Sequence, residues 1–396
     1  MRRSRGRPDL LAVAVASLVL VFVFVFFAGV VAGCKKHKPP PRVRIWMGAS
    51  HACSLQKTGD LECWGRNDAG QLGDRTTTTR ALPAPVLNIG NAGNAGNAGN
   101  AGKVEDLAIG TAHTCALSGG GVRCWGDGAR GQLGTGLTSA LGAPTLPVIA
   151  KGAPLAGVTA IAAGGDRSCA LTADGVRCWG DGVVDAIEPE GFRGVATKLA
   201  VGGGPGEGSF ACAAFVEPKT VRCVGSDERG QSAAHQPILT AVTIVGITAG
   251  AKHACVVLDN GDVQCWGAND HGQLGDGTHN DARIPALVHM PPALEVRAGA
   301  IYTCARLRNN TIACWGDNRA HQLVNGTSES SSTPAPVPGL VGVQELSLGG
   351  DSGCARLLDD GAVRCWGANA FGQLGDGTTQ AHDVPMPVRA AALLTP

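Results

Sequence analysis

The sequence is poor in aromatic residues and in charge, and these shortages exclude several classes of protein. Aromatic residues make up 4% of the 396-residue chain and charged residues 16%, below the roughly one quarter that is typical for charged residues. The formal net charge is +1, so no overall basic field favours nucleic acid. No Cys-x-x-Cys pair occurs, and no phosphate-loop, Rossmann, nucleophile-elbow or zinc-protease motif stands in context. We therefore predict no catalytic residues, no metal site and no cofactor.

The first 33 residues have the features of an export signal. Four arginines between residues 2 and 7 precede an apolar run from Leu10 to Gly33. The stretch Val31–Cys34 resembles the cleavage box of bacterial lipoproteins, in which the cysteine becomes the lipidated N-terminus. An uncleaved anchor is the alternative, because the run is long enough to span a bilayer. Both interpretations hold the following residues at a membrane outside the cytoplasm, and the first predicts lipidation of Cys34.

Fourteen of the fifteen cysteines form regularly spaced pairs, and Cys34 is the one left over. The members of a pair are 9 to 11 residues apart, and successive pairs follow at about 50 residues, a period that indicates a repeat architecture. The pairs are Cys53 with Cys63, Cys115 with Cys124, Cys169 with Cys178, Cys212 with Cys223, Cys255 with Cys265, Cys304 with Cys314, and Cys354 with Cys365.

Each pair brackets a predicted β-hairpin, with a Gly, Asp or Asn turn between two short apolar runs. Folding the first hairpin about Thr58 places Cys53 opposite Cys63, close enough for a disulfide. Zinc is the alternative, because three histidines lie two residues before a cysteine: His51, His113 and His253. Two cysteines per site are too few for structural zinc, and an exported chain meets an oxidising compartment. We therefore predict seven disulfides, and we expect the histidines to pack rather than act as bases.

A second motif follows most of the hairpins and carries a family resemblance. Gly65–Asp74 reads GRNDAGQLGD, and close copies begin at Gly267 and Gly367. These residues resemble the regulator of chromosome condensation (RCC1-like) repeat family, whose unit carries G-x-N-x-x-G-Q-L-G-x-G. The resemblance covers about residues 43–390 and implies an all-β, seven-bladed β-propeller of RCC1-like repeats, with one hairpin disulfide per blade. The paired cysteines and the export signal look more like exported bacterial relatives than eukaryotic members.

The repeats differ from one another in ways that generate further expectations. The third unit lacks Gly-Gln-Leu-Gly, and the fourth has Val224 in place of Trp and a glycine-rich insert, Gly203–Ser209. We expect Asp276 and Asp376 to form turns rather than bind calcium. The Arg-Cys-Trp triplets at Arg123, Arg177 and Arg364 are expected to stack between adjacent blades.

The chain is thus divided into four segments. Residues 1–33 are the lipoprotein signal peptide or membrane anchor, and residues 34–42 are a basic, Pro-rich tether. Residues 43–390 are the propeller, interrupted by a low-complexity loop at 91–102, and residues 391–396 are a tail. Closure of the ring is expected to bring residues 43–47 beside the last unit, near residues 385–389.

These features predict a non-enzymatic, membrane-tethered, extracytoplasmic propeller that presents loops for binding. The partners are the membrane, through the lipid or anchor, and a protein or surface glycan, with no nucleic acid; the propeller is expected to be a monomer. We place it in a bacterial cell envelope, with the outer membrane or cell surface favoured. Nucleotide exchange on a small GTPase is one alternative, implied by the family resemblance. A secreted enzyme inhibitor or surface hydrolase is the other.

Overall fold

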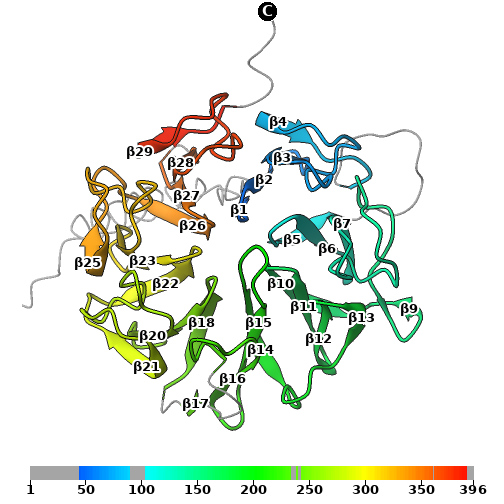
Figure 1. The fold of residues 1–396 in the computed structure, drawn as a ribbon, viewed down its shortest axis with the longest axis horizontal. Coiled ribbons are helices and arrows are strands. Elements are labelled where there is room, and N and C mark those ends of the chain that lie inside the picture. Colours follow the sequence, from blue (N-terminus) through cyan, green and yellow to red (C-terminus); the bar gives the residue numbers. More distant parts are fainter. Residues whose placement is uncertain (1–43, 90–102, 233–237, 240–241, 360, 390–396) are drawn as a thin grey trace, which may run out of the picture. The chain divides into compact units, whose positions relative to one another are not determined.

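The structure, a computed structural model, describes residues 44–89, 103–232, 238–239, 242–359 and 361–389. Within these ranges the chain forms strands and turns and contains no helix. Figure 1 shows antiparallel sheets arranged around a central axis, and we number the seven sheets of three or four strands as blades 1 to 7. The predicted all-β, seven-bladed propeller is therefore confirmed.

The strands of each blade follow one another in chain order, beginning at the axis. Blade 1 contains β1 (Arg44–Met47), β2 (His51–Leu55), β3 (Leu61–Gly65) and β4 (Arg80–Pro85). Blade 2 contains β5 (Val104–Ile109), β6 (His113–Ser118) and β7 (Gly121–Gly126), followed by a small hairpin of β8 (Ile149–Ala150) and β9 (Ala153–Pro154). Blade 3 contains β10 (Val158–Gly164), β11 (Arg167–Thr172), β12 (Gly175–Gly180) and β13 (Val183–Ile187).

The remaining four blades each have four strands. Blade 4 contains β14 (Ala196–Gly202), β15 (Phe210–Phe215), β16 (Thr220–Gly225) and β17 (Ile238–Leu239). Blade 5 contains β18 (Ile244–Ala249), β19 (His253–Leu258), β20 (Val263–Gly267) and β21 (Ala282–Val288). Blade 6 contains β22 (Ala293–Ala298), β23 (Tyr302–Leu307), β24 (Ile312–Gly316) and β25 (Ser331–Pro336). Blade 7 contains β26 (Val343–Gly349), β27 (Ser352–Leu357), β28 (Val363–Gly367) and β29 (His382–Pro387).

A disulfide joins the second and third strands of every blade. In blade 1, Cys53 lies directly opposite Cys63, as predicted, with the two Cα atoms 4.1 Å apart. The other six bonded pairs keep this opposition although the enclosed loop changes length. They are Cys115 with Cys124, Cys169 with Cys178, Cys212 with Cys223, Cys255 with Cys265, Cys304 with Cys314, and Cys354 with Cys365. All fourteen cysteines are buried, none more than 6% exposed, and the prediction of one hairpin disulfide per blade is confirmed.

The asparagine of the second motif organises the loop between the third and fourth strands. In blade 1, the Asn67 side-chain oxygen accepts from the Leu72 N–H at 2.9 Å, and its amide donates to the carbonyls of Thr76 and Thr78 at 3.1 Å. Asn67 is fully buried, so these bonds satisfy a polar group that would otherwise be costly to bury. Asn269, Asn318 and Asn369 accept the same bond from the leucine five residues later.

The tryptophan and the glutamine of the repeat are two halves of one contact between blades. The Trp125 indole N–H of blade 2 donates to the main-chain carbonyl of Gln71 in blade 1 at 2.9 Å. A side chain on Gly73 is excluded there, because a Cβ would lie 2.7 Å from the Trp125 Nε1. The same bond, at 2.9 to 3.0 Å, joins five further pairs: Trp179 to Gln132, Trp266 to Gln231, Trp315 to Gln273, Trp366 to Gln322 and Trp64 to Gln373.

The boundary between blades 3 and 4 is the exception, and it explains the two degenerate repeats together. Blade 3 lacks the glutamine loop and blade 4 has Val224 instead of Trp, so both halves of the same contact are missing. Phe192, which is fully buried, packs at this boundary. Its ring lies 6.2 Å from the ring of Phe215, in an apolar cluster that includes Val224. The two losses are therefore a single change at one boundary.

Blade 7 meets blade 1 without exchanging a strand. β1 pairs with β2, and β29 pairs with β28. The Met47 N–H donates to the Ser347 hydroxyl of β26 at 2.9 Å, and Ile45 shares an apolar cluster with Val388. The expectation that the first strand lies beside the last unit is confirmed for Arg44–Met47, although the contact is made by packing and not by pairing with β29.

Several predicted segments lie outside the described residues. They are the signal or anchor at 1–33, the tether at 34–42 with Cys34, the loop at 91–102 and the tail at 391–396. In the part of the chain that the structure describes, no helix has the length and apolar character needed to cross a bilayer.

We expect the fourteen paired cysteines to resist alkylation until the protein is both unfolded and reduced, because their sulfurs are bonded and buried. Intact-mass measurement after N-ethylmaleimide treatment checks this, with native, denatured and denatured-reduced samples compared. Adducts should appear on all fourteen only in the last sample. Alkylation of any of these cysteines in the native, unreduced protein would contradict the disulfide framework.

Candidate binding site in the central channel

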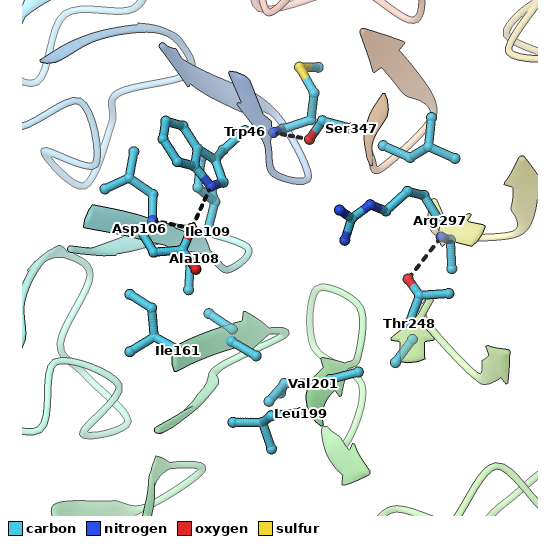
Figure 2. A pocket seen from close by; sticks show the side chains of 18 of the residues that line it. Trp46, Asp106, Ala108, Ile109, Ile161, Leu199, Val201, Thr248, Arg297 and Ser347 are labelled. Atoms are coloured by element: carbon cyan, nitrogen blue, oxygen red, sulfur yellow. Dashed lines mark hydrogen bonds between the residues drawn. The ribbon is translucent and has the colours of Figure 1, made fainter. Parts of the chain in front are cut away.

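A channel runs along the propeller axis, and the first strand of every blade supplies its wall. It contains two cavities, of about 270 Å³ and about 310 Å³. One cavity lies among charged side chains of the first strands, and we call it the charged mouth; it is lined by Arg44, Trp46, Asp106, Arg297 and Glu345 among others (Figure 2). The other lies where these strands end, and we call it the glycine mouth; it is lined by Gly48, Gly110, Gly164, Gly202, Gly250, Gly299 and Gly349 among others.

The charged groups of the charged mouth come from four consecutive blades, 6, 7, 1 and 2. Arg44 on β1 donates to the Asp106 carboxylate on β5 at 3.1 Å, and its guanidinium lies 4.6 Å from the ring centre of Trp46. The Trp46 indole N–H donates to the same carboxylate oxygen at 3.1 Å. Arg44 also lies 3.8 Å from a carboxylate oxygen of Glu345 on β26. The carboxylates on this side of the mouth are therefore already engaged by protein donors.

Glu345 is a largely enclosed acid that lines the mouth. Its side chain is 18% exposed, and Arg356 donates to it at 3.2 Å from the neighbouring strand. Burial raises the pKa of the Glu345 carboxyl, and the positive charges of Arg356, Arg44 and Arg297 act in the opposite direction. The carboxylate is thus held by arginines.

Arg297 differs from Arg44 because it extends from β22 into the open cavity (Figure 2). Its Nε donates to the Glu295 carboxylate at 2.6 Å, and that carboxylate also accepts from Arg306 at 3.1 Å. The wall across the cavity comes from blades 3, 4 and 5 and is apolar except for Thr248; it includes Ile161 and Leu199. The charged mouth therefore has one polar side and one apolar side.

The glycine mouth is walled by main chain. A Cβ on Gly349 would lie 2.3 Å from the Gly48 carbonyl oxygen of the next blade, so a side chain cannot be accommodated at this position. Main-chain bonds between blades reinforce the ring, such as the Ala251 N–H to the Ala300 carbonyl at 2.9 Å. The insert of blade 4 lies at this mouth, and its Glu207 is 3.3 Å from Lys252 of blade 5.

The three histidines of the repeat lie between blades and are fully buried. The His51 Nε2 is 2.8 Å from the Thr114 hydroxyl, which itself donates to the Gln71 carbonyl at 3.0 Å. A hydroxyl has one hydrogen, so Nε2 carries the proton of this histidine and Nδ1 carries none. Nδ1 has no hydrogen-bond partner within the described part of the chain. Burial lowers the pKa of His51 to about 3, with the charge of His113 contributing, and burial lowers the pKa of His113 and of His253 to about 4.

The type of residue that faces each histidine from the next blade depends on whether the histidine is present. The residue just before the first cysteine is Thr or Ser wherever the preceding blade has the histidine: Thr114, Ser168 and Thr303. It is Ala or Gly wherever the preceding blade has another residue: Ala52, Ala211, Ala254 and Gly353. The histidines therefore join blades and pack, as expected, and their low pKa values leave them neutral near pH 7.

The next expectations concern the roles of Asp276 and Asp376 and the binding of metal. The Asp376 carboxylate accepts from the Thr378 N–H and hydroxyl at 2.9 Å, and Asp276 does the same with Thr278, so both form turns. No group of three or more His, Cys, Asp or Glu side chains is arranged to hold a metal ion in the described ranges.

The expectation that the Arg-Cys-Trp triplets stack between adjacent blades is wrong. The tryptophans are buried and donate to glutamine carbonyls, as described above. The arginine–aromatic contacts of the structure occur instead at Arg44 with Trp46, Arg66 with Phe371 and Arg222 with Phe215. The indole is enclosed by the neighbouring blade's glutamine loop, where a glycine packs against its ring, so an adjacent arginine has no access to its face.

Sequence reasoning missed the charged mouth. Its residues precede the glycine that marks each repeat, and they differ from blade to blade, so no motif identifies them. The signal that could have identified these residues is their distance in sequence from the repeat glycine. Trp46 and Arg297 both lie two residues before it, and Arg44 and Glu345 both lie four residues before it.

Comparison with known proteins gives a consistent family. A family model described as RCC1-like domain matches residues 29–395. The human E3 ubiquitin-protein ligase HERC2 is 29% identical over 266 residues, which are 62% of this chain and 5% of HERC2. The ultraviolet-B receptor UVR8 of Arabidopsis thaliana is 29% identical over 255 residues, which are 63% of this chain and 47% of UVR8. The chain thus matches less than half the length of these curated relatives.

Solved structures share the fold. Prp20p from Saccharomyces cerevisiae has a TM-score of 0.70 at 18% identity, over 84% of this chain and 86% of that chain. The CRINKLY WD40 ectodomain of the Arabidopsis thaliana receptor kinase ACR4 has a TM-score of 0.52 at 22% identity, over 86% of this chain and 97% of that chain.

We expect the free energy of unfolding to fall as the pH is lowered from about 6.5 toward 4. The pKa of each buried histidine is lower in the folded than in the unfolded state, so the unfolded state binds more protons in this window. The loss is on the order of 2 kcal/mol per histidine at about pH 5. Urea unfolding at about pH 7.5 and about pH 5 measures it.

The double variant His253→Phe with Thr303→Ala is the matched control, because it copies the Phe210 and Ala254 pair of the preceding boundary. It should lose about a third of the histidine-linked pH dependence. An unchanged dependence in this variant would show that His253 is not a neutral, buried group.

Proposed function

The chain belongs to the RCC1-like domain family, and we propose that it is a non-enzymatic binding protein held at a membrane outside the cytoplasm. Its RCC1-like homologues indicate a binding or regulatory role. The proposal adds the compartment and the anchor: lipid attached at Cys34, in a bacterial cell envelope, with the outer membrane or cell surface favoured.

The observation that carries the proposal is the complete pairing of fourteen buried cysteines. Disulfides of this number persist in oxidising compartments and are rare in the cytosol, where thiols are kept reduced. Each bridge joins neighbouring strands of one blade, so the framework belongs to the fold and not to a regulatory switch. The basic head, the apolar run and Cys34 support the same compartment independently.

The binding surfaces are the loops at the two ends of the propeller, together with the channel. Recognition concentrates on loops that a rigid scaffold positions. Blades 3 and 4 depart from the repeat, and the insert Gly203–Ser209 replaces a much shorter connection in the other blades. We propose this region as the contact surface for a protein or a surface glycan, with the propeller acting as a monomer.

Regulation of a small GTPase is the alternative that family analogy offers. Prp20p is described as binding Gsp1p and histones, and similarity at 18% identity supports the fold alone. A cytosolic partner also requires a cytosolic propeller, in which the fourteen cysteines would be exposed to a reducing environment. A secreted enzyme inhibitor or surface hydrolase shares the compartment proposed here, and an inhibition or hydrolysis screen separates it from a binding protein.

We expect Cys34→Ser to abolish lipid labelling of the protein, because the sulfur of Cys34 is the proposed attachment atom. The full chain is produced in a bacterium fed a clickable fatty acid, and the label is read on the purified protein. Lys35→Gln is the matched control, since it changes the next residue without removing the sulfur, and it should label like the unaltered chain.

Absence of label on the unaltered chain would refute lipidation. Membrane association of that unlabelled chain would then identify the apolar run as an uncleaved anchor.

A further inference from the structure

The charged residues that line the mouth are two arginines and two carboxylates, and two further arginines and one carboxylate bond to them from behind. Four arginines, Arg44, Arg297, Arg306 and Arg356, are grouped with three carboxylates, those of Asp106, Glu295 and Glu345. Arg44, Arg306 and Arg356 each hold at least one of these carboxylates from the side or from behind. These seven residues together carry one net positive charge, and Arg297 is the arginine that extends into the cavity (Figure 2).

The bonding of Arg297 leaves one edge of its guanidinium available. Nε and Nη2 both point to one oxygen of Glu295, at 2.6 Å each, and Nη1 has no partner in the described chain. The side chain is 47% exposed, in contrast to 18% for Arg306 behind it. Glu295 thus fixes the direction of the guanidinium, and Nη1 is free to donate into the cavity.

The opposite wall is suited to an alkyl group. Figure 2 shows Leu199 and Val201 across the cavity from Trp46, with Ile161 between them and the blade 2 side. They come from β10 and β14, and β18 continues this wall with Ile247 and Ala249. The cavity of about 270 Å³ lies below the range of about 300–1,000 Å³ that is usual for drug-sized ligands, so its occupant is small.

We propose that the charged mouth is a binding site for a small amphipathic carboxylate, whose carboxylate meets Arg297 and whose alkyl group lies on the apolar wall of blades 3 to 5. A guanidinium edge binds a carboxylate through short, charge-assisted hydrogen bonds. A cationic ligand is disfavoured because Asp106, Glu295 and Glu345 are already held by arginines. This site goes beyond the proposed function, since it requires neither the membrane anchor nor a macromolecular partner.

The probe is N-acetyl-leucine, which combines one carboxylate with one branched alkyl group. Its binding to the purified full chain is measured by isothermal titration calorimetry at low salt and neutral pH, where the electrostatic attraction is least screened. We expect saturable one-to-one binding. N-acetyl-leucine amide has nearly the same shape without the charge, and N-acetylglycine keeps the charge without the alkyl group, so both should bind at least about tenfold more weakly.

The variant Arg297→Gln should weaken binding of N-acetyl-leucine about 10- to 100-fold, as expected for loss of a charge-assisted hydrogen bond. Glu295 keeps Arg306 as a partner in this variant, so the fold should persist, and an unchanged melting temperature checks that. Arg308→Gln is the matched control. Arg308 belongs to the same blade, is exposed and bonds the Asn260 carbonyl away from the channel, so its removal should leave the affinity unchanged.

Three results would overturn the proposal. They are failure of the unaltered protein to bind N-acetyl-leucine, equal binding of the amide, and equal weakening by Arg297→Gln and Arg308→Gln. None of them bears on the lipid anchor at Cys34, so the two proposals fail independently.

Discussion

The propeller depends on one hydrogen bond that recurs around the ring, from a tryptophan indole N–H to the main-chain carbonyl of a glutamine in the preceding blade. The strand ladders run within blades, so cohesion between blades rests on side-chain packing and on a few cross-blade bonds of this kind. The bond is buried, and a buried donor or acceptor left without its partner costs about 1–3 kcal/mol. This cost explains why the glutamine and the tryptophan are lost together at the boundary of blades 3 and 4, whose apolar cluster includes Phe192 and Phe215.

The disulfide acts on the same contact from inside the blade. Each second cysteine precedes the tryptophan position, so the bridge fixes the strand that presents the indole to the neighbouring blade. The two constraints together leave the first strands free to vary in sequence, because their main chain forms the wall of the channel while their side chains vary among the blades. The charged mouth arises from that freedom, with arginines and carboxylates on four blades and an apolar wall on the other three. A rigid ring with a variable lining is suited to binding, and the proposed envelope location supplies the oxidising conditions that its bridges require.

Much of the fold could be predicted from the sequence because the motifs that specify each blade are short and recur along the chain. The opposition of Cys53 and Cys63 follows from a short hairpin, and the glycine-rich second motif identifies the blade. The partnership of Trp125 with Gln71 could not be predicted in the same way, since the two residues are 54 positions apart and belong to different repeats. The charged mouth was missed for a different reason. Arg44, Arg297 and Glu345 meet only when the ring closes, and no two blades repeat the set.

Exchange of the indole N–H groups with deuterium tests the central claim most directly. The chain has seven tryptophans, and six of them donate to a glutamine carbonyl across a blade boundary. The seventh, Trp46, donates to Asp106 at the charged mouth and is only partly buried. In a proton–nitrogen correlation spectrum of the folded protein, six indole signals should exchange slowly and one rapidly. Rapid exchange of two or more signals, or equal protection of all seven, would contradict the assignment of these six bonds to the blade boundaries.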